Sequence, residues 1–337
     1  MIVPSTFFIA LLCTILSMVC WGTWANTFKW SGKWRFELFY YDYTLGVVIA
    51  AVIAALTFGS LGDDLSVYDN FLIAGKMKIL YGLAAGGIFN LANMLLVAAI
   101  SVAGMAVAFP VGIGLALVVG VIWNFALNPQ GNPELLFAGV ALVVCAIVVD
   151  ARAYSLHGEA KGAAARKAGV KGIALSLVSG VLMGSFYPLV ELGKQGENGL
   201  GPYSIGLVFS VGVFFSTFFY NIYFLNLPVQ GQPIGMFEYF TGTARQHALG
   251  VVGGAIWCAG AIANFAAASA PPSVQVGPAI SYALGQGATL ISALWGLLYW
   301  KEFDGAGPAV RRLIWIMLAL FVIGLSMVSV APLFAGK

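Results

Sequence analysis

The feature of this sequence that most restricts its fold is a series of apolar runs, each long enough to cross a membrane. A helix needs about 20 mainly apolar residues to cross the ~30 Å hydrocarbon core of a bilayer. Such runs recur along all 337 residues and leave almost no room for an aqueous domain. The first run lacks a preceding basic segment and a convincing cleavage site, so we expect a retained helix rather than a signal peptide. We predict ten spans, at residues 6–26, 38–60, 77–99, 103–126, 134–153, 172–193, 204–226, 248–269, 274–299 and 312–332.

The Lys and Arg residues are distributed unevenly among the loops of this predicted all-α polytopic membrane protein. Loops that follow odd-numbered spans hold 12 of the 16, and the other loops with the C-terminal tail hold the remaining four. Cytoplasmic loops of membrane proteins carry the excess of Lys and Arg. We therefore expect both termini outside and the basic segment 156–171 in the cytoplasm.

The composition excludes several classes of function. The hydrophobic fraction is 61%, the charged fraction is 9%, and the net charge of +3 is too small to indicate nucleic-acid binding. All four cysteines lie inside predicted spans and form neither a disulfide framework nor a metal-ligand spacing. No phosphate-binding loop and no nucleophile motif occurs in the sequence. We expect no catalytic residue, no metal and no cofactor, and a gradient rather than ATP as the energy source.

Weak internal similarity relates the two halves of the chain. Three short matches occur in the same order, at offsets of 162, 160 and 167 residues: Ser17 with Ser179, Tyr43 with Tyr203, and Gly86 with Gly253. Many transporters consist of two copies of one bundle. Five spans per copy is an odd number, so the copies would lie in opposite orientations. We expect a 5+5 inverted repeat, with a first repeat at 1–155, a cytoplasmic connector at 156–171 and a second repeat at 172–337.

Amides and prolines interrupt corresponding spans of the two halves. In the first half these residues are Asn90, Asn93 and Pro110. The matching set in the second half is Trp257, Asn264, Gln275, Pro278, Tyr282 and Gln286. Polar groups in a bilayer are costly unless they pair or line a cavity, so we expect a substrate site between the halves, with Pro110 and Pro278 as helix breaks. The alternative for each amide is a hydrogen bond to a neighbouring helix without ligand contact.

Two aromatic residues, Trp21 and Tyr187, lie deeper in their spans than the interfacial belts where most membrane Trp and Tyr reside. A ring beside amides suits a neutral polyhydroxylated or amide-bearing ligand, because the ring covers an apolar face while the amides bind the edges. Trp21 and Tyr187 are therefore predicted to contact the substrate.

Two acidic residues are candidates for proton coupling. Asp42 lies about one turn inside the second span, where a desolvated carboxylate can load and release a proton. Its alternative role is an ion pair with Lys33 or Arg35. Glu191 is the second candidate, although a pair with Lys194 three residues later would be structural. The two histidines, at positions 157 and 247, lie in or next to loops, and we assign them no role.

Several segments are similar to a known group of transporters. They are "YYDYTLGVVIAAVIAALTFGSLG", "GGIFNLANMLLVAAISVAGMAVAFPVGIG", the connector after the fifth span and "LWGLLYWKEFDGAG". With ten spans in 5+5 form, the chain resembles the drug/metabolite transporter superfamily, in the branch of the plant ureide permeases and the bacterial glucose, ribose and rhamnose porters. The resemblance implies proton-coupled uptake by alternating access, with the ligand between the halves.

The branch contains carriers of different solutes. The short connector, without the long hydrophilic insertion of plant ureide permeases, favours a bacterial inner-membrane porter. We expect a proton symporter that imports a monosaccharide of the glucose, rhamnose or fucose type. A ureide or purine permease of the same fold is the alternative, and a drug or metabolite exporter is less favoured. The expected partners are the solute, protons and lipid, with the fifth and tenth spans as candidate packing surfaces of a homodimer.

Overall fold

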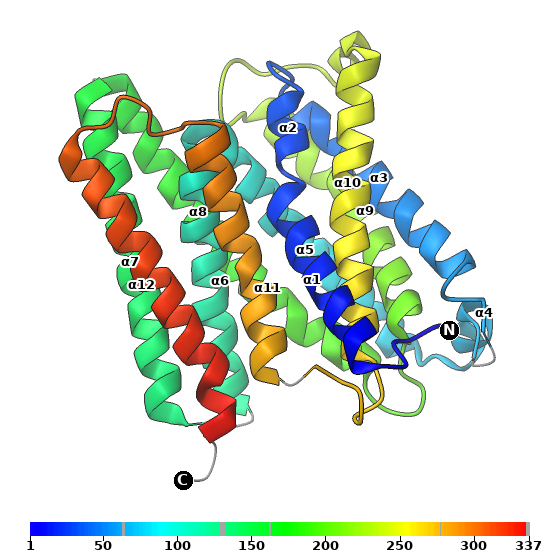
Figure 1. Ribbon diagram of the computed structural model, residues 1–337. Coiled ribbons are helices and arrows are strands. Elements are labelled where there is room, and N and C mark those ends of the chain that lie inside the picture. The colour runs from blue at the N-terminus through cyan, green and yellow to red at the C-terminus, as the bar shows by residue number, and fades with distance from the viewer. Residues whose placement is uncertain (63–64, 128–131, 162, 277, 335–337) are drawn as a thin grey trace. The chain divides into compact units, whose positions relative to one another are not determined.

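The computed structural model describes residues 1–62, 65–127, 132–161, 163–276 and 278–334, and all regular elements within these ranges are helical (Figure 1). The α-helices are α1 Phe7–Thr23, α2 Asn26–Trp30, α3 Phe36–Leu56, α4 Val67–Ile73, α5 Lys76–Ala103, α6 Met105–Leu127, α7 Pro133–Lys161, α8 Ala163–Lys194, α9 Pro202–Asn226, α10 Ala244–Ala268, α11 Pro278–Leu294 and α12 Pro308–Val330. Three shorter elements are the 3₁₀ helices η1 Met236–Thr241 and η3 Ala331–Phe334 and the π-helix η2 Trp295–Tyr299. The all-helical prediction is confirmed for the described residues.

Nine helical stretches within these ranges are long and apolar enough to cross a membrane. They correspond to the predicted spans one to eight and ten, because hydrophobic length is a direct consequence of bilayer thickness. The predicted ninth span, 274–299, differs. Val274 and Gln275 precede the helix, which begins at Pro278. Among the residues whose side chains are described, the apolar stretch in this span is Gly287–Tyr299. The number of ten membrane spans therefore stays a prediction.

The segment predicted as a connector, 156–171, is helical where it is described. α7 continues to Lys161 and α8 starts at Ala163. The segment is rich in Ala, Lys, Arg and Glu, which are among the best helix formers, so local propensity extends the two membrane helices into the polar region. A second unpredicted element, α4, is capped by Ser66, whose hydroxyl accepts from the amide of Asp69 at 3.1 Å.

Several helix starts follow from local sequence. α9 and α12 begin at Pro202 and Pro308, where a missing amide hydrogen costs nothing. α10 begins with a capping box: the hydroxyl of Thr243 accepts from the amide of Gln246 at 3.3 Å, and the Gln246 side chain accepts from the amide of Thr243 at 2.8 Å. Pro110 does not break a helix as predicted. It lies within α6, and the interruption precedes it at Gly104, whose φ is +85°.

The chain packs as two compact units. Unit 1 contains Met1–Leu91 and Phe186–Val276, and unit 2 contains Ala92–Ser185 and Gly277–Lys337. Each unit therefore combines a segment from each half, and α5 and α8 contribute to both units.

Unit 1 contains two helix contacts made through glycine. In the first, α3 packs on α10: Gly46 lies against the carbonyl oxygen of Val251, and Gly254 lies against that of Tyr43, so closely that neither position has room for a methyl group. Small residues let membrane helices approach to backbone contact.

The second contact, between α9 and α5, has the same form. Gly212 lies against the carbonyl oxygen of Leu83, and Gly86 lies against that of Phe209, again without space for a Cβ atom. The two contacts match at constant offsets. Phe209 and Gly212 of α9 follow Tyr43 and Gly46 of α3 by 166 positions, and Val251 and Gly254 of α10 follow Leu83 and Gly86 of α5 by 168.

Unit 2 is built around the pair α7 and α12, which also meet at glycines. A Cβ atom on Gly139 would lie 2.7 Å from the carbonyl oxygen of Gly324, and one on Gly324 would lie 2.8 Å from that of Gly139. Around this contact, buried aliphatic and aromatic side chains of α6, α7 and α12, including Val143, Met317 and Phe321, form one apolar core.

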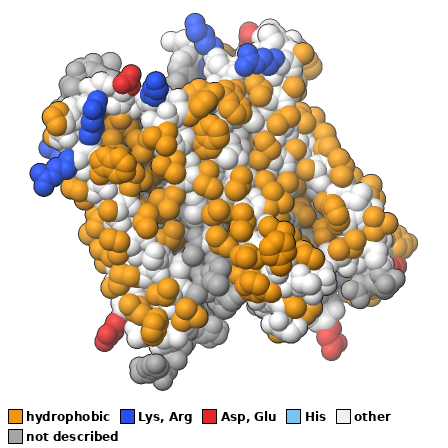
Figure 2. Space-filling model, in the orientation of Figure 1, with side chains coloured by type: hydrophobic (Ala, Val, Ile, Leu, Met, Phe, Trp, Pro, Cys, Tyr) orange, Lys and Arg blue, Asp and Glu red, His pale blue; other side chains and the backbone are white. Residues whose placement is uncertain are grey.

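Large apolar side chains also cover the outer surfaces, as lipid-facing helices require. Phe219 of unit 1 is 74% exposed and Trp315 of unit 2 is 72% exposed. On the face drawn in Figure 2, hydrophobic side chains cover the middle of the helices, and the Lys and Arg side chains lie towards their ends. The chain is a multi-pass membrane protein by these properties.

Candidate functional site

An aromatic cluster lies inside unit 1, where α1, α5, α9 and α10 meet. The indoles of Trp21 and Trp257 stack with centroids 6.3 Å apart and an interplanar angle of 22°. Phe89 lies 4.3 Å from the Trp257 ring, and Phe209 is stacked on it at 5.9 Å. The structure thus brings together two predicted site residues, Trp21 and Trp257, with two phenylalanines that the sequence analysis did not single out.

Asn90 follows Phe89 of this cluster along α5, and its side chain is only half satisfied. Its amide nitrogen donates to the hydroxyls of Ser216 at 2.8 Å and Thr217 at 2.9 Å, so it joins α5 to α9. Its carbonyl oxygen is buried without a hydrogen-bond partner, and so is the indole N–H of Trp21. Buried polar groups are normally paired, and exceptions require an explanation. An unpaired acceptor and an unpaired donor beside flat aromatic rings are suited to a planar ligand with both N–H and C=O groups.

The remaining predicted substrate residues lie in varied surroundings. Asn264 and Tyr187 are half-buried in unit 1, and Tyr187 packs against Phe186 at 6.1 Å. Asn93 is 1% exposed on α5, within the part of that helix that belongs to unit 2. Gln275 is exposed before α11, and its side-chain nitrogen donates to the carbonyl oxygen of Ala268 at 3.2 Å. It does not lie on a spanning helix as predicted, because the chain turns at Pro271–Val276.

Three predicted residues belong to α11. The side chains of Pro278, Tyr282 and Gln286 lie outside the described residues, although Pro278 is the first residue of the helix. A proline at this position starts a helix rather than breaking one.

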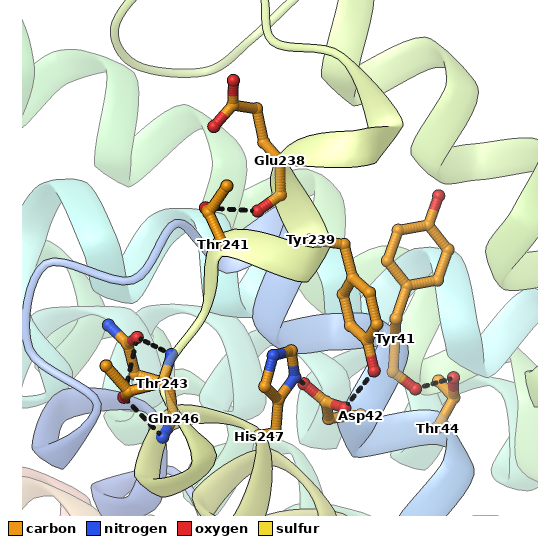
Figure 3. A network of polar contacts seen from close by, with 9 residues as sticks. All are labelled: Tyr41, Asp42, Thr44, Glu238, Tyr239, Thr241, Thr243, Gln246 and His247. Atoms are coloured by element: carbon orange, nitrogen blue, oxygen red, sulfur yellow. Dashed lines mark hydrogen bonds and ion pairs between the residues drawn. The ribbon is translucent and has the colours of Figure 1, made fainter.

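Asp42 is the centre of a second polar site in unit 1 (Figure 3). Its carboxylate is 2% exposed on α3, inside a membrane-spanning stretch. The Tyr239 hydroxyl donates to one carboxylate oxygen at 2.5 Å, and Nδ1 of His247 lies 2.8 Å from the other. The three residues come from α3, η1 and the first turn of α10, so the carboxylate joins three elements. The ring of Trp34 packs edge-on against His247 at 5.5 Å.

The arrangement fixes the role of Tyr239 as a donor. Burial, and then the hydrogen bond to the Asp42 carboxylate, raise the pKa of Tyr239 above its ordinary value. The phenol therefore keeps its proton at physiological pH.

The partners of Asp42 differ from those expected. Arg35 forms its ion pair with Glu37 rather than Asp42, with the guanidinium and carboxylate 2.5 Å apart. His247, to which we assigned no role, contacts Asp42 directly. The sequence contains no local signal for this contact, because His247 and Tyr239 lie about 200 residues from Asp42 along the chain.

Glu191 forms the structural pair that its spacing indicates. Its carboxylate lies 3.3 Å from the ammonium group of Lys194, and its side chain is 40% exposed. Among the described residues, no group of three or more His, Cys, Asp or Glu side chains is arranged to hold a metal ion.

Comparisons with known proteins find similarity to ureide permeases. A family model described as "Ureide permease" matches residues 39–169. The chain is 22% identical to "Ureide permease 1" of Arabidopsis thaliana, over 94% of this chain and 95% of the relative. It is 24% identical to "Ureide permease 5" of the same plant, over 95% and 94%. "Ureide permease 3" is 30% identical over 40% of each chain.

One solved crystal structure has a similar fold. It matches with a TM-score of 0.55 and 18% sequence identity, and the match covers 94% of this chain and 95% of the other. This likeness concerns the fold alone. The similarity to permeases over nearly the whole chain supports a membrane transporter.

Proposed function

We propose that this chain is a secondary transporter that carries a small neutral solute rich in amide groups, of the ureide or purine class. The observation that carries the proposal is the similarity over more than nine-tenths of the chain to relatives named as ureide permeases. The aromatic cluster around Trp257 supports the same class of solute. It offers flat rings, the unpaired carbonyl oxygen of Asn90 and the unpaired N–H of Trp21. A ureide presents the complementary carbonyl and N–H groups at the edges of a flat face.

The similarity favours this ureide alternative over the monosaccharide that we predicted first. Sugar hydroxyls also pair with amides and stack on indoles, so the aromatic cluster alone does not separate the two solutes. The names of the relatives support a ureide or purine as the first candidate and a monosaccharide as the second.

The proposed driving force is proton symport through Asp42. Three features support it: the carboxylate is buried inside a span, a histidine lies at 2.8 Å, and a tyrosine hydroxyl fixes its orientation. Adding a proton to Asp42 would remove a buried charge and weaken the contact with His247, so η1 and α10 would be held less tightly on α3. Protonation would in this way be coupled to a change in conformation.

The 5+5 inverted repeat remains part of the proposal, now supported by packing. The contact of Gly46 and Gly254 between α3 and α10 has an equivalent between α9 and α5, at constant offsets of 166 and 168 residues. The offset of 167 inferred from Gly86 and Gly253 agrees with this register within one residue. The offset of 160 inferred from Tyr43 and Tyr203 does not, since Phe209 takes the equivalent place.

With the same offset of 168 residues, Phe89 and Trp257 are equivalent residues, and their rings are in contact at a tilt of 32°. Residues that contact their own equivalents lie at the axis that relates two copies. We therefore propose that the axis of the repeat passes through the aromatic cluster. Binding between repeats is common in transporters.

The test uses the purified protein in two steps. Thermal unfolding is first measured with a ureide (allantoin), a purine base, glucose, rhamnose and a cationic dye, since a ligand at 100 times its Kd adds about 2.7 kcal/mol to the free energy of unfolding. Uptake of the stabilising compound into proteoliposomes is then measured with and without an imposed pH gradient. We expect a ureide or purine to stabilise the protein and to accumulate with the gradient.

Other outcomes would overturn separate parts of the proposal. Stabilisation and uptake of a sugar alone would restore the monosaccharide prediction. Ureide uptake that ignores the pH gradient and a protonophore would remove the proton coupling but leave the substrate class. We further propose that the protein catalyses no chemical step, that both termini lie outside, and that any homodimer forms through α7 and α12.

A further inference from the structure

A second buried acid, Asp150, lies in unit 2, away from any role assigned above. It belongs to the inward stripe of α7, where Val143, Ala146 and Ala153 are fully buried and apolar. Asp150 itself is 0% exposed, and neither of its carboxylate oxygens has a hydrogen-bond partner. A buried ionised carboxylate without donors is strongly disfavoured. Such a residue must be neutral or hold a cation.

A charge that acts on Asp150 comes from a second carboxylate, Glu302. It follows η2 and lies within electrostatic range of Asp150. Its two oxygens accept from the amides of Met105 at 2.9 Å and Ala106 at 2.7 Å, the first two residues of α6. Gly104 and Gly296 leave the space for this carboxylate, since a Cβ atom on Gly104 would lie 2.6 Å from its Oε2 and one on Gly296 would lie 2.7 Å from it.

The two acids therefore have opposite surroundings. Glu302 accepts hydrogen bonds from two backbone amides at the positive end of the α6 dipole, a position that favours a negative charge. Asp150 has no donor and faces that negative charge. When two carboxylates share a site, one ionises and the other keeps its proton.

The other described charged side chains on neighbouring elements lie at the surface. Arg152 of α7, Lys171 of α8, Lys301 and Asp304 of the loop after η2, and Arg311 and Arg312 of α12 are all exposed. Tyr154 donates to the carbonyl oxygen of Val102 at 3.4 Å, and His157 packs on Phe303 with ring centroids 5.3 Å apart.

From this geometry we propose that Asp150 and Glu302 form a proton-binding site, separate from Asp42, in which Asp150 holds the proton. The site is asymmetric: Glu302 remains the ionised cap of α6, and Asp150 is the member that exchanges its proton. Because Glu302 also closes the joint between α5 and α6, loss of the Asp150 proton would place two negative charges at this joint and strain it.

The proposal is tested by infrared spectroscopy of the purified full-length protein, which needs no knowledge of the solute. A protonated carboxyl group has a carbonyl stretch distinct from that of a carboxylate, and the band shifts when the proton exchanges for deuterium. We expect this band in the wild type at neutral pH and its loss in Asp150→Asn. Asp304→Asn, which changes an exposed acid two residues from Glu302, is the matched control and should keep the band.

A second measurement tests the proposal even if Asp150→Asn does not fold. Wild-type protein grown with carboxyl-¹³C aspartate should show the band displaced to lower frequency, which assigns it to an aspartic acid, and Asp42→Asn labelled in the same way should still show it. Absence of any protonated-carboxyl band in the wild type, or its persistence in folded Asp150→Asn, would overturn the proposal. So would insensitivity of the band to the ¹³C label.

Discussion

At the scale of single residues, the side chains of the two polar sites in unit 1 have different hydrogen-bonding states and therefore different proposed roles. Asn90 and Trp21 each keep one polar group without a partner, as a binding site for a solute requires. Asp42 is instead fully engaged by groups from two other elements, as a coupling site requires. Substitutions at the two sites should therefore have separable effects on binding and on coupling.

Asp42→Asn should uncouple transport from the proton gradient. Asparagine keeps an oxygen that can accept from Tyr239, but it cannot take up a proton. We expect the gradient-driven accumulation ratio to fall by roughly 5–150-fold, the range of a 1–3 kcal/mol coupling free energy, while exchange of solute without a gradient continues. Proteoliposome uptake measures both. Glu197→Gln, at an exposed acid, is the control; equal accumulation by Asp42→Asn and this control would exclude the coupling role.

Trp21→Phe should weaken solute binding without destabilising the protein. The substitution keeps an aromatic ring on Trp257 but removes the unpaired N–H, so one hydrogen bond to the solute is lost. We expect Kd to rise about tenfold, which corresponds to about 1.4 kcal/mol, and the free energy of unfolding to change by less than about 0.5 kcal/mol. Ligand titration and thermal unfolding test this. Trp315→Phe, at a 72% exposed tryptophan, should change neither quantity; an unchanged Kd in Trp21→Phe would remove Trp21 from the site.

Tyr239→Phe should show a pH-dependent loss of stability. The pKa of Tyr239 is raised in the folded protein, so the folded state binds this proton more tightly than the unfolded chain does. The stabilising contribution is fully present below the unfolded pKa of about 10 and is lost as the pH rises through the folded value.

The difference in melting temperature between the wild type and Tyr239→Phe should therefore be largest near neutral pH and should shrink above a pH of about 10. Tyr68→Phe, at a 71% exposed tyrosine, should show no such trend. A difference that grows with pH would have the wrong sign and would contradict the assignment of Tyr239 as donor.

At the scale of helices, backbone contacts through glycine set how closely the elements pack. Gly254→Ala and Gly86→Ala each place a methyl group against a carbonyl oxygen of the partner helix. Overpacking costs about 1–3 kcal/mol, and we expect similar losses at the two positions because they occupy equivalent contacts. Thermal unfolding in detergent provides the comparison.

Gly120→Ala is the control for this pair, because a Cβ atom on Gly120 of α6 meets nothing within 4 Å. That substitution should be neutral or stabilising by up to about 1 kcal/mol, as expected for alanine within a helix. If Gly86→Ala behaved like Gly120→Ala while Gly254→Ala did not, the equivalence of the two contacts would be lost.

The elements themselves were largely predictable from the sequence, because bilayer thickness imposes a length that apolar runs reveal directly. The helical extension through 156–161 and 163–171 was missed because polarity was used to mark the end of a span, whereas Ala, Lys and Arg continue a helix beyond lipid. The partners of Asp42 were missed for a different reason. A contact between residues about 200 positions apart depends on how α3 and α10 pack, and periodicity within one helix contains no information on that.

At the scale of the molecule, the proposed repeat is functionally uneven. With the offsets of the glycine contacts, the residues equivalent to Asp42 and His247 are Val208 and Ile79, both apolar. Gly82 contacts Val208 just as Gly250 contacts Asp42, which supports the register. The titratable pair thus occurs in one of two equivalent places. A coupling group present once, near one end of unit 1, would sense protons from one side of the membrane.

The loops of unit 1 make contacts that agree with the expected topology. Loops after the first and seventh spans are joined by Arg35, whose guanidinium donates to the carbonyl oxygen of Gln232 at 2.6 Å. Loops after the second and sixth spans are joined by the amide of Gly75 and the carbonyl oxygen of Asn198 at 3.0 Å. In unit 1, a loop after an odd-numbered span therefore contacts another such loop, and a loop after an even-numbered span contacts another of its kind. This is the pattern expected when successive spans cross the membrane in opposite directions.

Which of these two ends faces the cytoplasm is the last prediction. Because 12 of the 16 Lys and Arg residues follow odd-numbered spans, those loops should be cytoplasmic and both termini outside. In a bacterial host, alkaline phosphatase fused to the C-terminus should be active and green fluorescent protein fused there should be dark. The same reporters inserted in the loop 227–235 should give the reverse. A fluorescent C-terminal fusion with an outside N-terminus would mean an odd number of spans, and fluorescence with both termini inside would reverse the side from which Asp42 receives its proton.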